Sequence, residues 1–253
     1  MTYSFDKAFD LKGQVALITG GASGIGKCIA ELFAERGATL ILVDKSEAVH
    51  ETARALGENN LSWVADVSDE ASAVQIVADS AQKLGRIDIL VNNAGIGPLA
   101  KSEETPADLW DITMAVNLRG PFLYAREVGK QMLKQKSGRI VNLASQAALV
   151  ALDGHLAYCA SKAGVLGMTR VMAMEWGPEG ITVNAISPTV VETELGAGGY
   201  WSGETGANFK AKVPARRFAQ PEEIAMSALY LVSGAAGMVN GENLVVDGGY
   251  TAT

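Results

Sequence analysis

Short apolar runs alternate with longer amphipathic stretches along nearly the whole chain. Seven of these runs have the length of a strand, and most are apolar throughout rather than at every second position. Uninterrupted apolar character is typical of parallel strands that helices cover on both faces. The predicted strands are Gln14–Thr19, Thr39–Asp44, Leu61–Ala65, Ile87–Asn92, Gly138–Ala144, Ile181–Ser187 and Asn243–Asp247.

The stretches between these runs have the period of helices. After the third run, apolar residues recur at helical spacing, at Val74, Val77, Ala78, Ala81 and Leu84. Strands that alternate with such helices form βαβ units with right-handed crossovers. The sequence therefore predicts an α/β fold, a single-domain Rossmann-type doubly wound sheet of about seven parallel strands flanked by helices, over residues 1–253.

Residues 189–220 break this rhythm, because they are rich in glycine and contain no clean strand. An insertion of this length in a compact α/β domain is usually a lid or a binding loop. It follows the sixth predicted strand and so leaves the carboxyl edge of the sheet, where such folds bind ligands. We predict a substrate lid at about 189–220.

Composition and charge narrow the class of protein. Apolar residues make up 48% of the 253 residues and charged residues 19%, which supplies one buried core and argues against disorder. The net charge of -7, with no basic cluster, argues against a nucleic-acid partner. Two separated cysteines and two distant histidines favour neither a disulfide framework nor a metal site. No signal peptide or membrane span is evident, so we expect a cytoplasmic protein.

A glycine-rich turn, TGGASGIG at residues 19–26, joins the first predicted strand to a helix. Its glycines let the backbone turn sharply and let a pyrophosphate approach the helix amino terminus, where unpaired N–H groups favour negative charge. The pattern predicts a nucleotide site. The expected contacts are Gly20, Ser23, Gly24, Ile25 and Gly26.

Two carboxylates follow the next two strands. Asp44 can accept hydrogen bonds from the adenosine ribose hydroxyls and would repel a 2′-phosphate, which favours NAD as the cofactor. Lys45 is the one feature that weakens this preference, and a helix cap or solvated strand end is the alternative for Asp44. Asp66 can hold the adenine amino group with Val67 beneath the ring, whereas Ser68 or Asp69 is expected to cap the next helix.

The segment SQAALVALDGHLAYCASK, residues 145–162, carries the candidate chemistry. Tyr158 and Lys162 are four residues apart on a predicted helix and therefore share one face. A free tyrosine has a pKa of about 10, and a nearby ammonium together with an oxidised nicotinamide would favour its phenolate. Ser145 ends a strand, so its hydroxyl can bind the substrate oxygen while Tyr158 exchanges the proton. His155 either faces the substrate or only begins the helix.

In combination these motifs resemble the short-chain dehydrogenase/reductase family over essentially the whole chain. The residues that carry the resemblance are TGGASGIG at 19–26, DV at 66–67, NNAG at 92–95, the asparagine of MAVNLRG, Ser145, YCASK at 158–162 and VVDGGY at 245–250. The resemblance implies a nicotinamide cofactor, oxidation of alcohols or reduction of carbonyls, and a homotetramer or dimer.

The resemblance also implies roles for individual residues. Tyr158 matches the acid/base, Lys162 its partner, Ser145 the substrate-orienting hydroxyl, and Asn117 the fourth member, expected to hold a water that connects Lys162 to solvent. The remaining expected cofactor contacts are Asn93, Ala94, Gly95, Pro188, Val191 and Thr193. The family's Pro-Gly pair appears here as Pro188-Thr189, which alters the site beside the nicotinamide.

Three functions remain open from sequence. The first is an NAD-dependent oxidoreductase that interconverts a secondary alcohol and its ketone, and PTVVETELG resembles members that act on polyols or sugar alcohols. The expected lid lining suits a small hydroxylated substrate: Tyr200, Trp201, Ser202, Glu204, Thr205 and Asn208, with Glu192 and Glu194 at its base. The second is a 3-oxoacyl-thioester (acyl-carrier-protein) reductase, which the basic residues Lys210, Lys212, Arg216 and Arg217 keep open. The third is a non-catalytic NADH-sensing protein.

Overall fold

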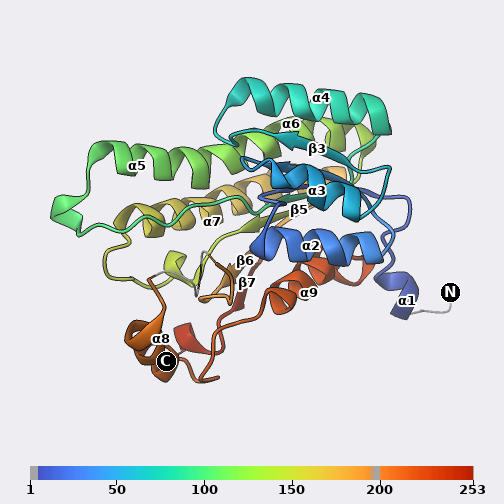
Figure 1. Cartoon of the computed structure of the whole chain (residues 1–253). Coiled ribbons are helices and arrows are strands. Elements are labelled where there is room, and N and C mark those ends of the chain that lie inside the picture. The colour runs from blue at the N-terminus through green and yellow to red at the C-terminus, as the bar shows by residue number, and fades with distance from the viewer. Residues whose placement is uncertain (1–4, 195, 197–199, 253) are drawn as a thin grey trace.

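The computed structural model describes residues 5–194, 196 and 200–252, and these contain one seven-stranded parallel sheet (Figure 1). The strand order is β3-β2-β1-β4-β5-β6-β7, so the chain reverses its direction of winding between β1 and β4. This confirms the predicted α/β fold. The strands are β1 (Val15–Thr19), β2 (Thr39–Asp44), β3 (Leu61–Val64), β4 (Ile89–Asn92), β5 (Gly138–Leu143), β6 (Ile181–Pro188) and β7 (Asn243–Val246).

Each predicted strand is present, and its bounds differ from the prediction by at most two residues at an end. The largest difference is at β4, which begins at Ile89 rather than Ile87. Even there, Asp88 continues the sheet's bonding, because its N–H donates to the Val15 carbonyl at 2.8 Å and its carbonyl accepts from the Arg139 N–H at 2.9 Å.

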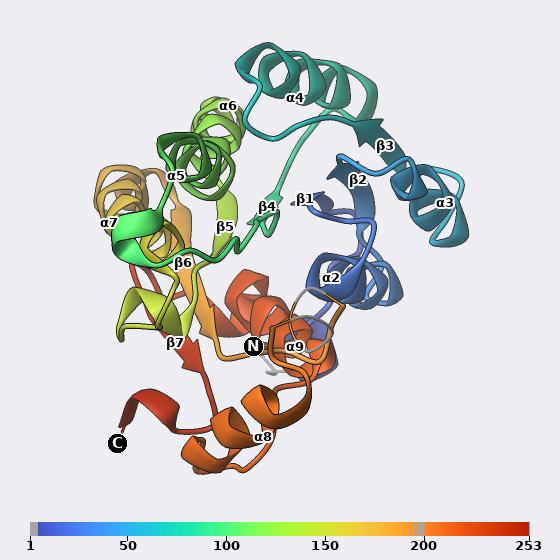
Figure 2. The ribbon, with the colours of Figure 1, turned by 60° about the vertical axis from the view of Figure 1, so that its left-hand side comes forward.

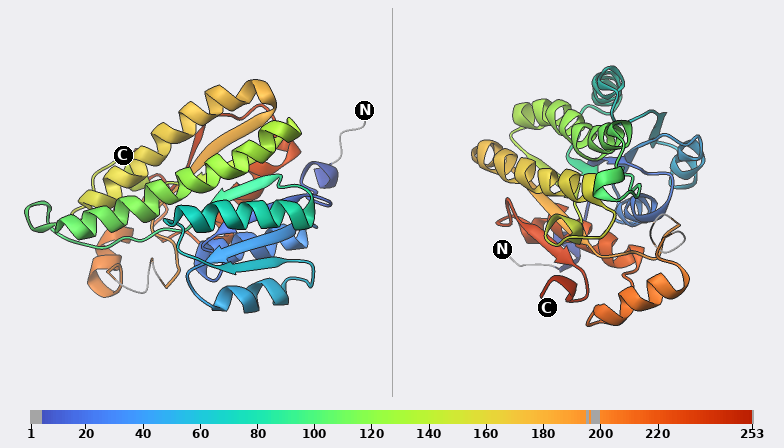
Figure 3. Two further views of the ribbon diagram at one scale, coloured as in Figure 1. Left: turned by 90° about the horizontal axis from the view of Figure 1, so that it is seen from above. Right: turned by 90° about the vertical axis from the view of Figure 1, so that its left-hand side faces the viewer.

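Helices cover both faces of the sheet, as Figures 2 and 3 show. On one face lie α4 (Glu70–Leu84), α5 (Ala107–Met114), α6 (Gly120–Gln135) and α7 (Leu156–Trp176). A π-helical turn at Ala115–Arg119 joins α5 to α6 without a break. On the other face lie α2 (Gly24–Glu35), α3 (Ala48–Ala55) and α9 (Pro221–Val232), while the four-residue α1 (Phe5–Ala8) precedes β1.

The burial of the sheet on both sides explains the apolar runs in the sequence. In β1, Leu17 belongs to the core cluster under α4 and α6, whereas its neighbour Ile18 belongs to the cluster under α2 and α9. Both side chains are fully buried. Successive residues of a strand point to opposite faces, so a strand with a core on each side needs apolar residues at every position.

The predicted apolar stripe of α4 was only partly right. Ala73, Ile76, Val77 and Ser80 are its buried residues, whereas Val74 is 42% exposed. The buried stripe is thus rotated by about one residue from the predicted one. Alanine and serine are small enough to pack in a tight helix–sheet contact. A prediction from apolar periodicity underestimates the burial of such small residues.

The segment at 189–220 contains a helix that the sequence did not predict, α8 (Gly203–Lys212). The base of the segment is closed, because Val191 pairs with Ala219 in an isolated parallel bridge. Phe209 of α8 packs with Val213 and Phe218 in a separate small core and stacks on Tyr250 near the carboxyl terminus, at 5.0 Å between ring centroids. Figure 3 shows α8 beyond the end of the main helical layers.

No helix in the described part of the chain is long and apolar enough to cross a membrane. Within the same residues, no cluster of three or more His, Cys, Asp or Glu side chains is arranged to hold a metal ion.

Candidate active site

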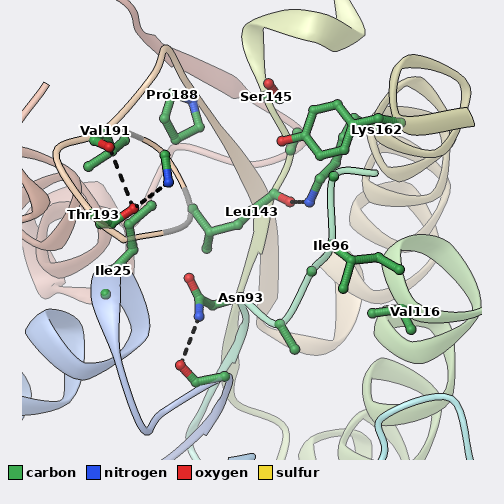
Figure 4. Close-up of a pocket in the computed structure, with 18 of the residues that line it drawn as sticks. Ile25, Asn93, Ile96, Val116, Leu143, Ser145, Lys162, Pro188, Val191 and Thr193 are labelled. Carbon is green, nitrogen blue, oxygen red and sulfur yellow. Dashed lines mark hydrogen bonds between the residues drawn. The ribbon is translucent and has the colours of Figure 1, made fainter. Parts of the chain in front are cut away.

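A cavity of about 620 Å³ opens at the carboxyl ends of the strands, at the point where the winding reverses. Figure 4 shows part of its lining, with Ser145 and Lys162 on one side and Pro188, Val191 and Thr193 on the other. Most of the predicted site residues border this cavity: Gly20, Ser23, Gly24, Ile25, Asp44, Asp66, Val67, Asn93, Ala94, Gly95, Ser145, Tyr158, Lys162, Pro188, Val191 and Thr193. Gly26 and Asn117 are not part of its lining.

The glycine turn presents uncapped backbone N–H groups to the cavity. Gly20 and Gly24 have φ of +71° and +54°, a conformation that favours glycine. Ser23 occupies the N-cap position of α2 without a side-chain hydrogen bond, and the first turn of the helix carries no acidic residue. A helix amino terminus of this kind fits the pyrophosphate of a dinucleotide.

Asn93 fastens this turn to the end of β4. Its side-chain amide donates to the carbonyls of Thr19 at 3.0 Å and Gly20 at 3.1 Å. Gly26 allows this contact, because a Cβ there would lie 2.1 Å from the Gly20 carbonyl oxygen and 2.4 Å from Asn93 Nδ2. Gly26 therefore acts through close packing beneath the turn.

We expect Gly26→Ala to weaken NADH binding by at least tenfold, because the added methyl group would push the turn away from Asn93. Fluorescence titration with NADH measures the dissociation constant. Gly237→Ala is the matched control, since its Cβ would meet only the Gly234 carbonyl at 3.6 Å. Equal affinities in the two variants would contradict the packing role of Gly26.

Asp44 and Asp66 both border the cavity, and both also hold backbone in place. The Asp44 carboxylate accepts from the N–H of Ala22 at 3.0 Å and of Ser46 at 2.9 Å, so it supports the glycine turn directly. Hydrogen bonds from the Ser68 hydroxyl and N–H hold the pKa of Asp66 below its usual range. Lys45 Nζ lies 3.7 Å from Asp66 Oδ2, so the carboxylate partly balances the charge of the ammonium.

The predicted helix cap also appears. Asp69 is the N-cap of α4, and its carboxylate accepts the N–H of Ser72 at 2.9 Å. Asp66 is thereby left with its carboxylate at the cavity edge rather than in the cap.

Asn117 lies in the π-helical turn, fully buried beneath the cavity. Its side chain accepts from the Ile96 N–H and donates to the Ile96 carbonyl, both at 2.8 Å, and it donates to Ser161 Oγ at 3.2 Å. Asn117 thus clamps the loop after β4 against α7. Its role with a water beside Lys162 remains a prediction.

Tyr158 and Lys162 lie on one face of α7, as predicted, and Lys162 Nζ is 5.7 Å from the centre of the Tyr158 ring. Lys162 is 5% exposed, and its ammonium donates to the Leu143 carbonyl at 2.7 Å, a bond drawn in Figure 4. Ser145 follows β5, next to Ala144, and borders the same cavity as Tyr158, while its hydroxyl accepts the Ala147 N–H at 3.1 Å. A strand end and a helix face therefore meet at one cavity.

The protein's own charges do not make Tyr158 acidic. Burial raises its pKa, and the hydrogen bond with Ser145 offsets only part of this effect. Burial also lowers the pKa of Lys162, to about 8. The expectation that the Lys162 ammonium together with an oxidised nicotinamide favours the phenolate remains a prediction.

The wall of the cavity beside Tyr158 is aromatic. His155 is the N-cap residue of α7 and also lines the cavity, and its contact with the substrate remains a prediction. Its ring lies against Trp201 at 5.9 Å and edge-on to Tyr158 at 6.0 Å. Its Nδ1 lies 2.7 Å from the Asp153 carbonyl, which can only accept, so Nδ1 carries the proton.

Of the expected lid lining, Trp201 and Glu194 border the cavity, whereas Glu204, Thr205 and Asn208 do not. These three lie on the exposed side of α8, because the helix turns Phe209 and Gly206 toward its small core. The predicted polar lining from α8 is wrong for this reason.

The sequence reasoning missed Gln146, which directly follows Ser145 and is 1% exposed at the cavity. Neither polar atom of its side chain has a hydrogen-bond partner among the described residues, and the same holds for the hydroxyl of Thr189. The adjacency of Gln146 to Ser145 was the only signal available.

A family model described as Enoyl-(Acyl carrier protein) reductase matches residues 20–251. A NAD-dependent glycerol dehydrogenase of Listeria innocua is 49% identical over 253 residues, which cover 99% of either chain. A D-threitol dehydrogenase of Mycolicibacterium smegmatis is 52% identical over 253 residues, which cover 98% of this chain and 96% of the relative. The chain belongs to the short-chain dehydrogenase/reductase family.

Solved structures agree with this membership. A gluconate 5-dehydrogenase of Burkholderia cenocepacia, crystallised with NADP and tartrate, superposes with a TM-score of 0.93 at 34% identity and covers 99% of this chain and 100% of its own. As a short-chain dehydrogenase/reductase, the protein is an oxidoreductase that acts with a pyridine nucleotide on a small molecule.

Proposed function

We propose that the protein is an NAD-dependent dehydrogenase that interconverts a polyol or sugar alcohol and its keto form at a secondary carbon. The observation that carries the proposal is the meeting of Ser145, Tyr158 and Lys162 in the cavity that the glycine turn also borders. The names of the glycerol and D-threitol dehydrogenases support the substrate class.

Each residue of the site has a distinct role. The glycine turn and Asp44 hold the dinucleotide, whose nicotinamide supplies the hydride acceptor or donor. Ser145 donates to the substrate oxygen, and Tyr158 takes the alcohol proton during oxidation and returns it during reduction. Lys162 places a cation behind the phenol, held in position by the Leu143 carbonyl at 2.7 Å.

Asp44 supports NAD as the cofactor, because its carboxylate is fixed at the cavity edge and no Lys or Arg lies within the glycine turn. We expect Asp44→Asn to raise the ratio of kcat/KM with NADP to kcat/KM with NAD by about tenfold. The amide keeps an acceptor for the Ala22 N–H while losing the charge that repels a 2′-phosphate.

Asp69→Asn serves as the control for that measurement, since Asp69 caps α4 and does not border the cavity. Initial rates with the two cofactors at fixed substrate give the ratio. An unchanged ratio in Asp44→Asn would mean that the carboxylate only supports the turn.

The alternative hypothesis, a 3-oxoacyl-thioester reductase, has less support than a polyol dehydrogenase. Of the four basic residues near α8, Arg217 is paired with Glu223 at 2.6 Å, and Arg216 donates to the Ala211 carbonyl. Lys210 lies over the Phe218 ring at 4.9 Å. Only Arg217 has a carboxylate partner among these contacts, so the lower support for this rival comes from Asp44 and from the glycerol and D-threitol dehydrogenase relatives.

The decisive test of the proposed function is a substrate panel followed by NADH absorbance at 340 nm. C3–C6 polyols, the matching ketoses, a 3-oxoacyl thioester and simple alcohols are each offered with both cofactors. We expect the highest kcat/KM with a polyol and NAD. A preference for the thioester with NADP would replace the proposal by its rival, and no turnover with any compound would favour a sensing role.

We also propose that residues 189–220 form a lid over the substrate, with Trp201 as its contact to His155. The closed base at Val191 and Ala219 supports a segment that moves as a unit. A cytoplasmic location remains a proposal on the expectation from sequence.

A homo-oligomer is the proposed assembly, because large apolar side chains are exposed on several elements, α7 and α9 among them. Val171 and Met174 lie on α7, with Met174 72% exposed, whereas Met226 on α9 and Met238, 99% exposed, lie near β7. Two self-complementary patches would build a tetramer with twofold symmetries. We expect light scattering to give the mass of a tetramer or dimer, and a monomer would contradict the proposal.

A further inference from the structure

Two residues that line the cavity have buried side-chain polar atoms without a hydrogen-bond partner among the described residues. Gln146 is 1% exposed and Thr189 8% exposed, and both border the cavity. Neither the amide oxygen nor the amide nitrogen of Gln146, nor the hydroxyl of Thr189, has a hydrogen-bond partner among the described residues. Buried polar groups are nearly always hydrogen-bonded, so atoms left unpaired at a cavity indicate a ligand that pairs them.

These two residues lie at neighbouring strand ends. Gln146 begins the short helix Gln146–Ala148 after β5, directly next to Ser145, and Thr189 follows the last residue of β6. The helix contacts β6. The two residues therefore lie at the carboxyl ends of adjacent strands, and Gln146 directly follows Ser145.

The chemistry of the two side chains specifies what they pair with. A primary amide offers a donor and an acceptor side by side, and a hydroxyl is also both a donor and an acceptor. One alcohol hydroxyl can accept from the amide N–H and donate to the amide oxygen, so a single hydroxyl pairs both polar atoms of Gln146. The Thr189 hydroxyl can donate to or accept from the same group, and no charged residue is needed for an uncharged polyol.

We infer that Gln146, assisted by Thr189, is the specificity-determining residue that recognises the hydroxyl on the carbon next to the reacting carbinol. The enzyme is thereby selective for vicinal diols over simple secondary alcohols. This inference rests on the proposed function and adds the structural requirement that the substrate must meet. A site built to bind a hydroxyl rejects the analogue that lacks it, because its polar groups are then left unpaired.

The test compares butane-2,3-diol with butan-2-ol, since the two differ only in the second hydroxyl. The wild type is expected to prefer the diol by at least about 100-fold in kcat/KM. Gln146→Met keeps the length of the side chain without its polar atoms, and we expect it to lower this preference about 50-fold while the rate with butan-2-ol is kept or increased. Thr189→Val should lower the preference about fivefold.

Thr182→Val is the matched control, because Thr182 also has a buried, unpaired hydroxyl on β6 but lies at the far end of the strand, away from the cavity. It should leave the preference unchanged. NADH affinity, measured by titration, should be the same in all four proteins, which separates loss of substrate recognition from loss of the fold.

The outcomes separate this inference from the proposed function. A wild type that prefers the diol, with an unchanged preference in Gln146→Met, overturns the inference and leaves the proposed function in place. A wild type that oxidises neither the diol nor any polyol overturns both. A loss of NADH affinity in Thr189→Val would show that Thr189 binds the cofactor. Gln146 would then be the only one of the two residues that recognises the diol.

Discussion

Replacing Tyr158 by phenylalanine should lower kcat by about 10³-fold or more and leave the dissociation constant of NADH within threefold of the wild type. The phenol is the group that exchanges the proton, and general acid–base catalysis supplies effects of this size. The ring remains in place against His155, so the shape of the cavity is kept. Initial rates and a fluorescence titration measure the two quantities.

Tyr124→Phe is the matched control for this variant. Tyr124 is likewise a fully buried tyrosine, in the core under α6, and its hydroxyl has no partner among the described residues. Its removal should leave kcat unchanged and cost no stability. If Tyr158→Phe retained more than a tenth of the wild-type kcat, Tyr158 would not be the proton-transfer group.

The second large effect is expected at Lys162, where activity and stability should change in opposite directions. Lys162→Met removes the cation behind the phenol, and we expect kcat to fall about 10³-fold. The same change should make the ligand-free protein more stable at pH 7 by about 1 to 2 kcal/mol. The reason is that Lys162 carries a buried ammonium whose hydrogen-bond partner among the described residues is the neutral Leu143 carbonyl.

The sign of the pH dependence follows from the pKa. Burial lowers the pKa of Lys162 from 10.5 to about 8, which corresponds to about 3 kcal/mol against the charged form. This cost is fully present below pH 8 and disappears as the pH rises toward 10.5, where the unfolded chain also loses the proton. Loss of the hydrogen bond to Leu143 offsets about 1 kcal/mol of the gain in the variant.

Urea unfolding of both proteins at pH 7 and pH 9.5 measures the difference in stability. The advantage of Lys162→Met should shrink at the higher pH. A variant that is less stable than the wild type at pH 7, or an advantage that grows with pH, would show that the ammonium is compensated by its surroundings.

Much of the fold could be predicted because the strands carry an unambiguous signal. Leu17 and Ile18 are adjacent, face opposite cores and are both apolar, and no helix with one solvated face would need that pattern. Helix faces were harder to predict. In α4 the buried Ser80 and the exposed Val74 reverse the usual preference, so apolar periodicity alone misplaces the buried face.

The candidate site could be predicted wherever a residue type is required by the backbone or by the chemistry, as for Gly20, Ser145, Tyr158 and Lys162. The parts of the site that depend only on tertiary packing could not be predicted from the sequence. The anchor of Lys162 is a backbone carbonyl, which any residue at position 143 would supply. The inward face of α8 and the unpaired amide of Gln146 depend on packing between segments distant in sequence.

The ring of Trp201 against His155 has a practical consequence for studying this enzyme. The sequence contains four tryptophans, and Trp201 is the one that borders the cavity in the described part of the chain. Indole emission depends strongly on its immediate surroundings, and a compound entering beside Tyr158 displaces solvent next to this ring. We therefore expect the emission of Trp201 to change when a compound occupies the cavity, so that binding of ligands without absorbance can be followed by fluorescence.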